Sequence, residues 1–87
     1  MSKVTFADEG WEDYLYWQEQ DKKTLKKINK LLRSIERDGA MSGEGKPEHL
    51  KYNDGYSRRI DELNRLVYMI ADDDSITVKS CKGHYED

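Results

Sequence analysis

A set of polar residues in the C-terminal half carries groups suited to acid–base chemistry or phosphate binding: Glu48, Lys51, Arg58, Arg59, Arg65, His84 and Tyr85. Together they suit the cleavage of RNA through its own 2′-hydroxyl. A carboxylate or histidine can take the 2′-OH proton, and histidine is the usual acid for the departing 5′-oxygen. Arginine stabilises the negative phosphorane with a bidentate fork, and an aromatic ring can stack on a neighbouring base. This chemistry requires no metal ion.

Each of these residues, taken singly, also has a structural interpretation. Successive side chains of a strand point to opposite faces, so Arg58 and Arg59 should separate. One of them could serve only to pair with an acid of the turn at 61–64. Glu48 and His84 could equally lie on the solvated surface. The residue types therefore suggest a chemistry without establishing that the groups converge.

A β-sheet has to position these groups. The run 65–71 is apolar on both faces, which predicts a central strand. The segment 56–60 predicts a second strand, and 75–81 alternates like a strand with one buried face. A short β-branched segment at 3–6 predicts a first strand near the N-terminus. Polar turns separate the later strands, at 53–55, 61–64 and 72–74.

Two helices are predicted between the first strand and the others. Residues 11, 14, 15 and 18 recur at helical spacing, which predicts a helix from about Asp8, as its N-cap, to Gln20. We expect its aromatic residues to pack in the core: Trp11, Tyr14, Tyr16 and Trp17. Asp21 then caps a second helix that runs to about Arg37 and ends before Gly39.

The second helix has two chemically distinct faces. At about 100° per residue, its apolar residues share one arc: Leu25, Ile28, Leu31, Leu32 and Ile35. The opposite arc forms what we call the basic stripe: Lys22, Lys23, Lys26, Lys27, Lys30 and Arg33. A flexible connection at 40–45 and the stiffer Lys46-Pro47 then lead to Glu48. A strand, two helices and an antiparallel meander indicate an α+β fold.

Composition limits the classes of function. A chain of 87 residues leaves room for one domain, spanning 1–87. The net charge of −3 argues, by itself, against nucleic acid. However, segment 8–21 holds six acids and no Lys or Arg, whereas 22–37 holds seven Lys or Arg and one acid. The average charge therefore hides a dipolar molecule.

The sequence gives no sign of a membrane, a disulfide or a metal. No apolar run approaches the roughly 20 residues of a membrane helix, and the start lacks the apolar core of a signal peptide. We therefore expect a cytoplasmic protein. Cys81 is the sole cysteine, and His49 and His84 lie far apart. No Gly-rich phosphate loop follows a strand, and we expect no cofactor.

Ordered motifs along nearly the whole chain resemble the YoeB/Txe toxins of the RelE superfamily. The motifs are 11–18, 26–32, 45–51, 57–60, 65–68 and the closing His84-Tyr85. The resemblance implies a microbial-ribonuclease fold, in which two helices pack on an antiparallel sheet. It also implies catalytic roles: Glu48 looks like the general base, His84 like the general acid, and Arg65 like the group that stabilises the phosphorane.

The same resemblance implies how RNA and partners are bound. Lys51 and Arg59 look like phosphate-contacting residues, and Tyr85 like the aromatic that orients the mRNA. Members of the family are ribosome-dependent mRNA interferases that enter the ribosomal A site and cut the codon there. A cognate YefM-type antitoxin silences them, and homodimers occur among relatives. The basic stripe then gains a use, because it could dock on the phosphates of ribosomal RNA.

Some features depart from the family pattern, and two alternatives stay open. His49 stands where relatives commonly carry Pro, and Glu86 and Asp87 extend the chain beyond His84-Tyr85. Acids beside His84 should raise its pKa and repel phosphate. One alternative keeps the fold but acts like the ParE-type toxins that inhibit gyrase without nuclease activity. The other is a non-catalytic binding module that uses its acidic and basic helices.

Overall fold

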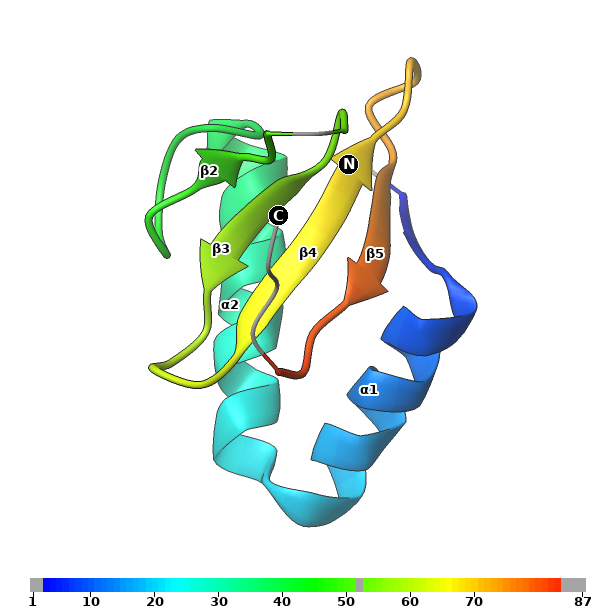
Figure 1. Ribbon diagram of the computed structural model, residues 1–87, viewed down its shortest axis with the longest axis vertical. Helices are drawn as coiled ribbons and strands as arrows, with labels where there is room; N and C mark the ends of the chain where they lie inside the picture. Colours follow the sequence, from blue (N-terminus) through cyan, green and yellow to red (C-terminus); the bar gives the residue numbers. More distant parts are fainter. Residues whose placement is uncertain (1–2, 52, 84–87) are drawn as a thin grey trace.

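The computed structural model describes residues 3–51 and 53–83. Along the chain its elements are β1 (Val4–Phe6), α1 (Asp8–Gln20), α2 (Lys22–Asp38), β2 (Glu48–His49), β3 (Tyr56–Arg59), β4 (Arg65–Ile70) and β5 (Ile76–Ser80). The five strands form one sheet; α2 runs behind β3 and β4, and α1 lies beside β5 (Figure 1). The predicted α+β fold is therefore confirmed. No helix in these two ranges is long and apolar enough to cross a membrane.

The sheet is mixed rather than wholly antiparallel. Its strand order is β1-β5-β4-β3-β2, which puts β4 at the centre as predicted. The β2–β3, β3–β4 and β4–β5 pairs are antiparallel, but β1 lies parallel to β5. Short hairpins force their strands to be antiparallel, whereas the long connection through α1 and α2 leaves the direction of β1 free. The expected antiparallel sheet is thus correct for four strands and wrong for β1.

Strand β2 was not predicted, because two polar residues carry no periodic signal. It lies at one edge of the sheet, where Glu48 pairs with Ser57 and His49 with Tyr56. This pairing brings the segment after the 40–45 connection onto β3. Edge position also leaves both β2 residues exposed to solvent.

The two helices begin differently. Asp8 is the first residue of α1 rather than its cap; Ala7 occupies the N-cap position and offers no side-chain hydrogen bond. At α2 the predicted cap is present, because the Asp21 carboxylate accepts from the backbone N–H groups of Lys23 and Thr24, at 3.1 and 3.3 Å. Gly39 ends α2 with φ at 95°, a left-handed conformation that favours glycine.

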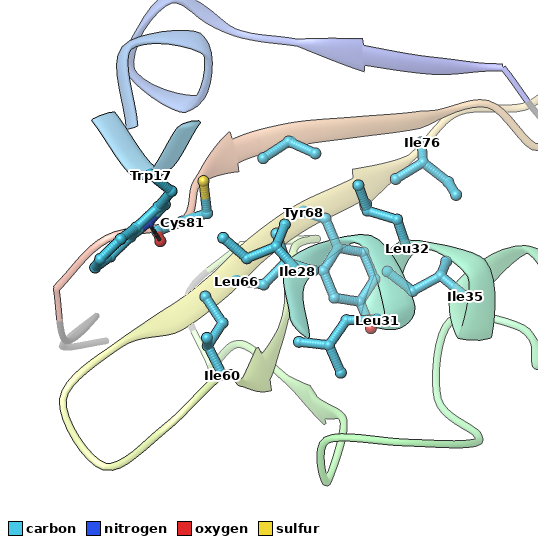
Figure 2. Packing of buried hydrophobic residues seen from close by; sticks show 11 residues of the cluster. Trp17, Ile28, Leu31, Leu32, Ile35, Ile60, Leu66, Tyr68, Ile76 and Cys81 are labelled. Atoms are coloured by element: carbon cyan, nitrogen blue, oxygen red, sulfur yellow. Dashed lines mark hydrogen bonds between the residues drawn. The ribbon is translucent and has the colours of Figure 1, made fainter. Parts of the chain in front are cut away.

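The core lies between the helices and one face of the sheet. Figure 2 shows its main members, including Ile28, Leu31, Leu32 and Ile35 of α2, Leu66 and Tyr68 of β4, and Ile76 of β5. The predicted apolar arc of α2 is thus confirmed, with Leu25 only partly buried. Helix α1 adds Trp17, whose indole N–H donates to the Cys81 carbonyl at 2.8 Å.

The expectation that all aromatic residues of α1 are buried was wrong. Trp17 is buried, but Trp11 and Tyr16 are 45% and 42% exposed. Trp11 instead stacks on Tyr14 and meets the edge of Phe6 with a centroid separation of 5.6 Å. A short helix beside β5 presents only one stripe to the core, so its other aromatic residues stay near the surface.

Candidate active site

The outer face of the sheet, which we define as the face away from α2, carries the candidate site. Side chains alternate along each strand, so Leu66 and Tyr68 enter the core while Arg65 points to the outer face. In the register of the sheet, Glu48 pairs with Ser57 and Arg59 pairs with Arg65. Three strands that are separated in sequence therefore bring a carboxylate and two guanidinium groups to one end of this face.

Arg65 is the best-fixed of these groups. Its side chain is 16% exposed, and Nε and Nη2 both donate to the Ser57 Oγ, at 3.2 and 3.1 Å. Its backbone N–H donates to the Gly83 carbonyl at 3.0 Å. The guanidinium is thus held along one edge, which orients the planar group for a bidentate contact with an anion.

Glu48 lies beside this arginine but remains accessible. One of its carboxylate oxygens is 3.7 Å from Arg65 Nη2, and its side chain is 70% exposed. At this distance the contact is an ion pair rather than a hydrogen bond, and such exposed pairs contribute at most about 1 kcal/mol. The carboxylate can therefore turn toward an incoming hydroxyl at little cost, while Arg65 stays nearby to bind negative charge.

Of the other predicted site residues, the structure describes Arg59 and Lys51 but not His84 and Tyr85. Arg59 is exposed at the end of β3, and its backbone N–H donates to the Gly45 carbonyl at 2.7 Å. Lys51 is exposed in the turn that follows β2. His84 and Tyr85 lie outside the described residues. The preceding residue, Gly83, donates its N–H to Asn64 Oδ1 at 2.8 Å and is bonded to the backbone of Arg65, as given above.

Sequence reasoning missed Ser57 and only partly resolved the Arg58-Arg59 pair. Alternation along β3 would have put Ser57 and Arg59 on one face, but only the register makes Ser57 a diagonal neighbour of Arg65, within hydrogen-bond reach of its guanidinium. The two arginines do separate: Arg58 is completely buried on the helix side, whereas Arg59 is exposed. The structural interpretation therefore applies to Arg58, although its partners are not the acids of the turn.

The basic stripe of α2 is exposed except at one position. Five of its six members are exposed: Lys22, Lys23, Lys26, Lys30 and Arg33. Lys27 is half-buried, and its ammonium donates to the Glu44 carboxylate at 2.7 Å. This hydrogen bond lowers the pKa of Glu44 and keeps the pair ionised. Lys27 is therefore tied to the 40–45 connection rather than presented to a partner.

Neither metal nor thiol chemistry finds support in the described part of the chain. No cluster of His, Cys, Asp and Glu suited to a metal ion occurs in residues 3–51 and 53–83. Cys81 is buried, and burial raises the pKa of its thiol to about 12. A thiol with such a pKa stays protonated and is a poor nucleophile. The described groups of this site with acid–base or anion-binding chemistry are those of the outer face.

The strand order, the two helices and the charged outer face together define a small protein of the RelE-like fold. Within that class, a family model described as "YoeB-like toxin of bacterial type II toxin-antitoxin system" matches residues 6–85. Because the match covers nearly the whole chain, the protein belongs to this family. The family suggested by the sequence motifs is thereby confirmed.

Individual relatives agree with this assignment. The chain is 49% identical over 85 residues to the protein named Toxin YoeB of Escherichia coli (strain K12), covering 95% of this chain and 99% of that protein. It is similar to a chain in a heterotetrameric YoeB-YefM toxin–antitoxin complex from Staphylococcus aureus, with a TM-score of 0.90, 50% identity and coverage of 98% and 99%. It is also similar to a chain of a YoeB dimer from the same organism, with a TM-score of 0.89 and 52% identity, covering 97% of this chain and 98% of that chain.

Proposed function

We propose that the protein is a ribosome-dependent endoribonuclease that cuts mRNA at the ribosomal A site in the cytoplasm. The observation that carries the proposal is the juxtaposition of Glu48 with a braced Arg65 on the outer face, at 3.7 Å. Membership of the YoeB-like toxin family supports it. No observation of the described chain favours gyrase inhibition or a purely binding role over this activity.

In the proposed reaction the 2′-hydroxyl of one nucleotide attacks the adjacent phosphorus. Glu48 orients the 2′-hydroxyl and accepts its proton while the new O–P bond forms. Arg65 stabilises the charge that gathers on the non-bridging oxygens of the phosphorane. The bond to the 5′-oxygen then breaks, His84 supplies the proton to that oxygen, and a 2′,3′-cyclic phosphate remains upstream. Proton loss and proton gain balance without water or metal.

Binding of the RNA is assigned to three further residues. Lys51, exposed after β2, and Arg59, exposed at the end of β3, contact phosphates. Tyr85 stacks on a base next to the scissile bond. Contacts of this kind hold the substrate without reading sequence, so any codon preference must come from elsewhere.

The exposed part of the basic stripe is proposed to dock on ribosomal RNA. Lys22, Lys23, Lys26, Lys30 and Arg33 face solvent along α2, so their charges can replace counterions on a phosphate backbone. Charge reversal of Lys23, Lys26 and Lys30 should weaken cosedimentation with ribosomes and reduce its salt dependence. Lys3→Glu, away from the stripe, is the control. The loss of ribosome binding is divided by the number of charges reversed, so that the two variants can be compared. Equal binding of the stripe variant and the wild type would contradict the docking role.

We further propose that a YefM-type antitoxin inhibits this protein and that it can form homodimers. The support is that structural neighbours of this chain include the toxin of a YoeB-YefM complex and a YoeB dimer. An antitoxin that covers the outer face would keep mRNA from Glu48 and Arg65.

The activity is tested by primer extension on mRNA bound to translating bacterial ribosomes. Wild-type protein should produce cuts confined to the A-site codon, whereas naked mRNA should stay largely intact. Glu48→Gln keeps the size of the side chain but removes its basic oxygen, and Arg65→Met removes the positive charge; both should slow the cuts severely, to a residual rate measured in long single-turnover incubations. Absence of cuts from the folded wild-type protein would refute the nuclease assignment, and gyrase inhibition would then be assayed.

A further inference from the structure

Arg58 is an unusual residue because a permanently charged side chain is completely buried in so small a protein. It lies on the helix side of β3, between Ser57 and Arg59, whose side chains belong to the outer face. A buried guanidinium is costly unless its donors are satisfied. Its hydrogen-bond partners therefore show which part of the structure the buried guanidinium stabilises.

All of these partners are neutral oxygens, and most belong to one loop. Nε donates to the Tyr68 hydroxyl at 2.8 Å, and Nη1 donates to the Ser34 hydroxyl at 3.1 Å. The remaining bonds go to main-chain carbonyls of the loop that follows α2: Glu44 at 2.8 Å, Gly39 at 2.7 Å, Ser42 at 2.6 Å and Ala40 at 3.4 Å. The 39–44 loop is thus wrapped around the guanidinium.

Apart from this network, the loop is held by the Lys27–Glu44 ion pair and by the bond from the Arg59 N–H to Gly45, and it has no buried side chain of its own. No residue from Gly39 to His49 is buried, and Met41 is exposed, so the segment lacks an apolar anchor. Gly43 and Gly45 adopt φ values of 99° and 92°, a conformation that only glycine adopts readily. Two further hydrogen bonds come from the same network: the Tyr68 hydroxyl donates to the Ala40 carbonyl, and the Glu44 N–H donates to the Ser34 hydroxyl.

This loop leads directly into the candidate active site. The Gly45 carbonyl accepts from the Arg59 N–H at 2.7 Å, and three residues later Glu48 pairs with Ser57. The start of β2 is therefore fixed on one side by β3 and on the other by a loop whose shape depends on Arg58. We infer that Arg58 is a positioning residue, which holds the 39–45 loop so that Glu48 is placed beside Arg65. This inference rests on the proposed nuclease function.

Arg58→Lys tests the inference because it keeps the charge but supplies donors from a single nitrogen, which cannot reach oxygens spread around the loop. Cleavage of ribosome-bound mRNA is measured at a temperature where circular dichroism shows every variant folded. We expect kcat to fall about 10- to 100-fold, as small misplacements of catalytic groups do, with KM unchanged. Tyr68→Phe removes one hydroxyl of the network and should cause a smaller fall of the same kind. Should Arg58→Lys fail to fold, Tyr68→Phe carries the test.

A merely structural role predicts different results. Val4→Ala destabilises the core at β1, the edge strand on the far side of the sheet from β2, and serves as the stability control. Combined with Glu48→Ala, Arg58→Lys should cause no further loss, because it acts through Glu48. The inference is overturned if the two losses add, or if Val4→Ala slows cleavage as much as Arg58→Lys does.

Hydrogen exchange separates a failure of this inference from a failure of the proposed function. Arg58→Lys, or Tyr68→Phe in its place, should speed exchange of the Glu44 and Arg59 amides, which donate to Ser34 and Gly45, while those of β4 and β5 stay protected. If wild-type protein does not cut mRNA, the nuclease proposal fails, whereas faster exchange confined to the loop still supports its dependence on Arg58. Unchanged exchange overturns the inference whatever the activity.

Discussion

Removal of the Ser57 hydroxyl should slow RNA cleavage by releasing Arg65. In the structure this one oxygen accepts two N–H groups of the guanidinium, at 3.1 and 3.2 Å, and Ser57 itself is buried. Hydrogen bonds to charged groups contribute about 1.5–3 kcal/mol. Both bonds share one acceptor, and Arg65 is partly exposed, so water can replace part of what Ser57→Ala removes. We therefore expect a loss near the lower limit.

A loss of about 1.4 kcal/mol in transition-state stabilisation corresponds to a tenfold slower reaction. The assay is single-turnover cleavage of ribosome-bound mRNA by Ser57→Ala, with melting temperatures measured in parallel. Thr77→Val is the matched control, because it removes a hydroxyl on β5 that is bonded to Thr5 at 3.0 Å and lies away from Arg65. Its rate should equal that of the wild type.

A double-mutant cycle shows whether the effect passes through the arginine. In an Arg65→Met background, Ser57→Ala should cause no additional loss, because the group it orients is absent. Wild-type rates for Ser57→Ala, or losses that add fully to those of Arg65→Met, would refute the reasoning. The first result would mean that Arg65 needs no bracing, and the second that Ser57 acts on another group.

Three further predictions concern stability and reactivity. Gly45→Ala should lower the melting temperature more than Gly39→Ala, because both have positive φ but only at Gly45 would a Cβ lie 2.7 Å from Leu31 Cδ2; equal losses would contradict this. Asp21→Ala should lower the melting temperature by about 5 °C through loss of the α2 cap. Hydrogen bonds from Thr24 lower the pKa of Asp21 below its ordinary value of 3.8. The cap therefore stabilises the fold fully above pH 3.8, and this stabilisation is lost as the pH falls below that value. An Asp21→Ala variant as stable as the wild type at pH 7 would exclude a stabilising cap. Cys81 should resist alkylation at pH 8 until denaturant is added, and rapid labelling of the native protein would contradict its burial. Burial raises the pKa of the Cys81 thiol from 9.0 to about 12. The thiol of the unfolded chain therefore loses its proton first, and the stability of the fold should decline between pH 9 and pH 12.

Local sequence patterns were sufficient for the elements that a periodic signal defines. Helix α2 was predicted because its apolar arc, its Asp21 cap and its Gly39 terminus all agree. The central position of β4 followed from a run that is apolar on both faces. Signals of this kind depend only on residues that are close in sequence, so they can be read without knowledge of the fold.

Features that depend on distant pairing could not be predicted. The parallel direction of β1 is set by its pairing with β5, about 70 residues later in the chain, and β2 is a strand only because Glu48 pairs with Ser57. The bracing of Arg65 by Ser57 needs the β3–β4 register, in which a slip of one residue would reverse the face. The burial of Arg58 needs the 39–44 loop, whose composition resembles an ordinary flexible connection.

The exposure of Glu48 bears on why such a nuclease would depend on the ribosome. A side chain that is 70% exposed lies in a nearly aqueous environment, where its interaction with Arg65 is weak. Electrostatic stabilisation of a phosphorane becomes strong only when water is excluded. Within residues 3–51 and 53–83, Glu48 lies on an open face of the sheet rather than in a closed cleft. Under the proposed function, the ribosome must exclude water by covering the outer face. Binding to the ribosome should therefore raise the rate of RNA cleavage by Glu48 and Arg65, with no change in the residues themselves.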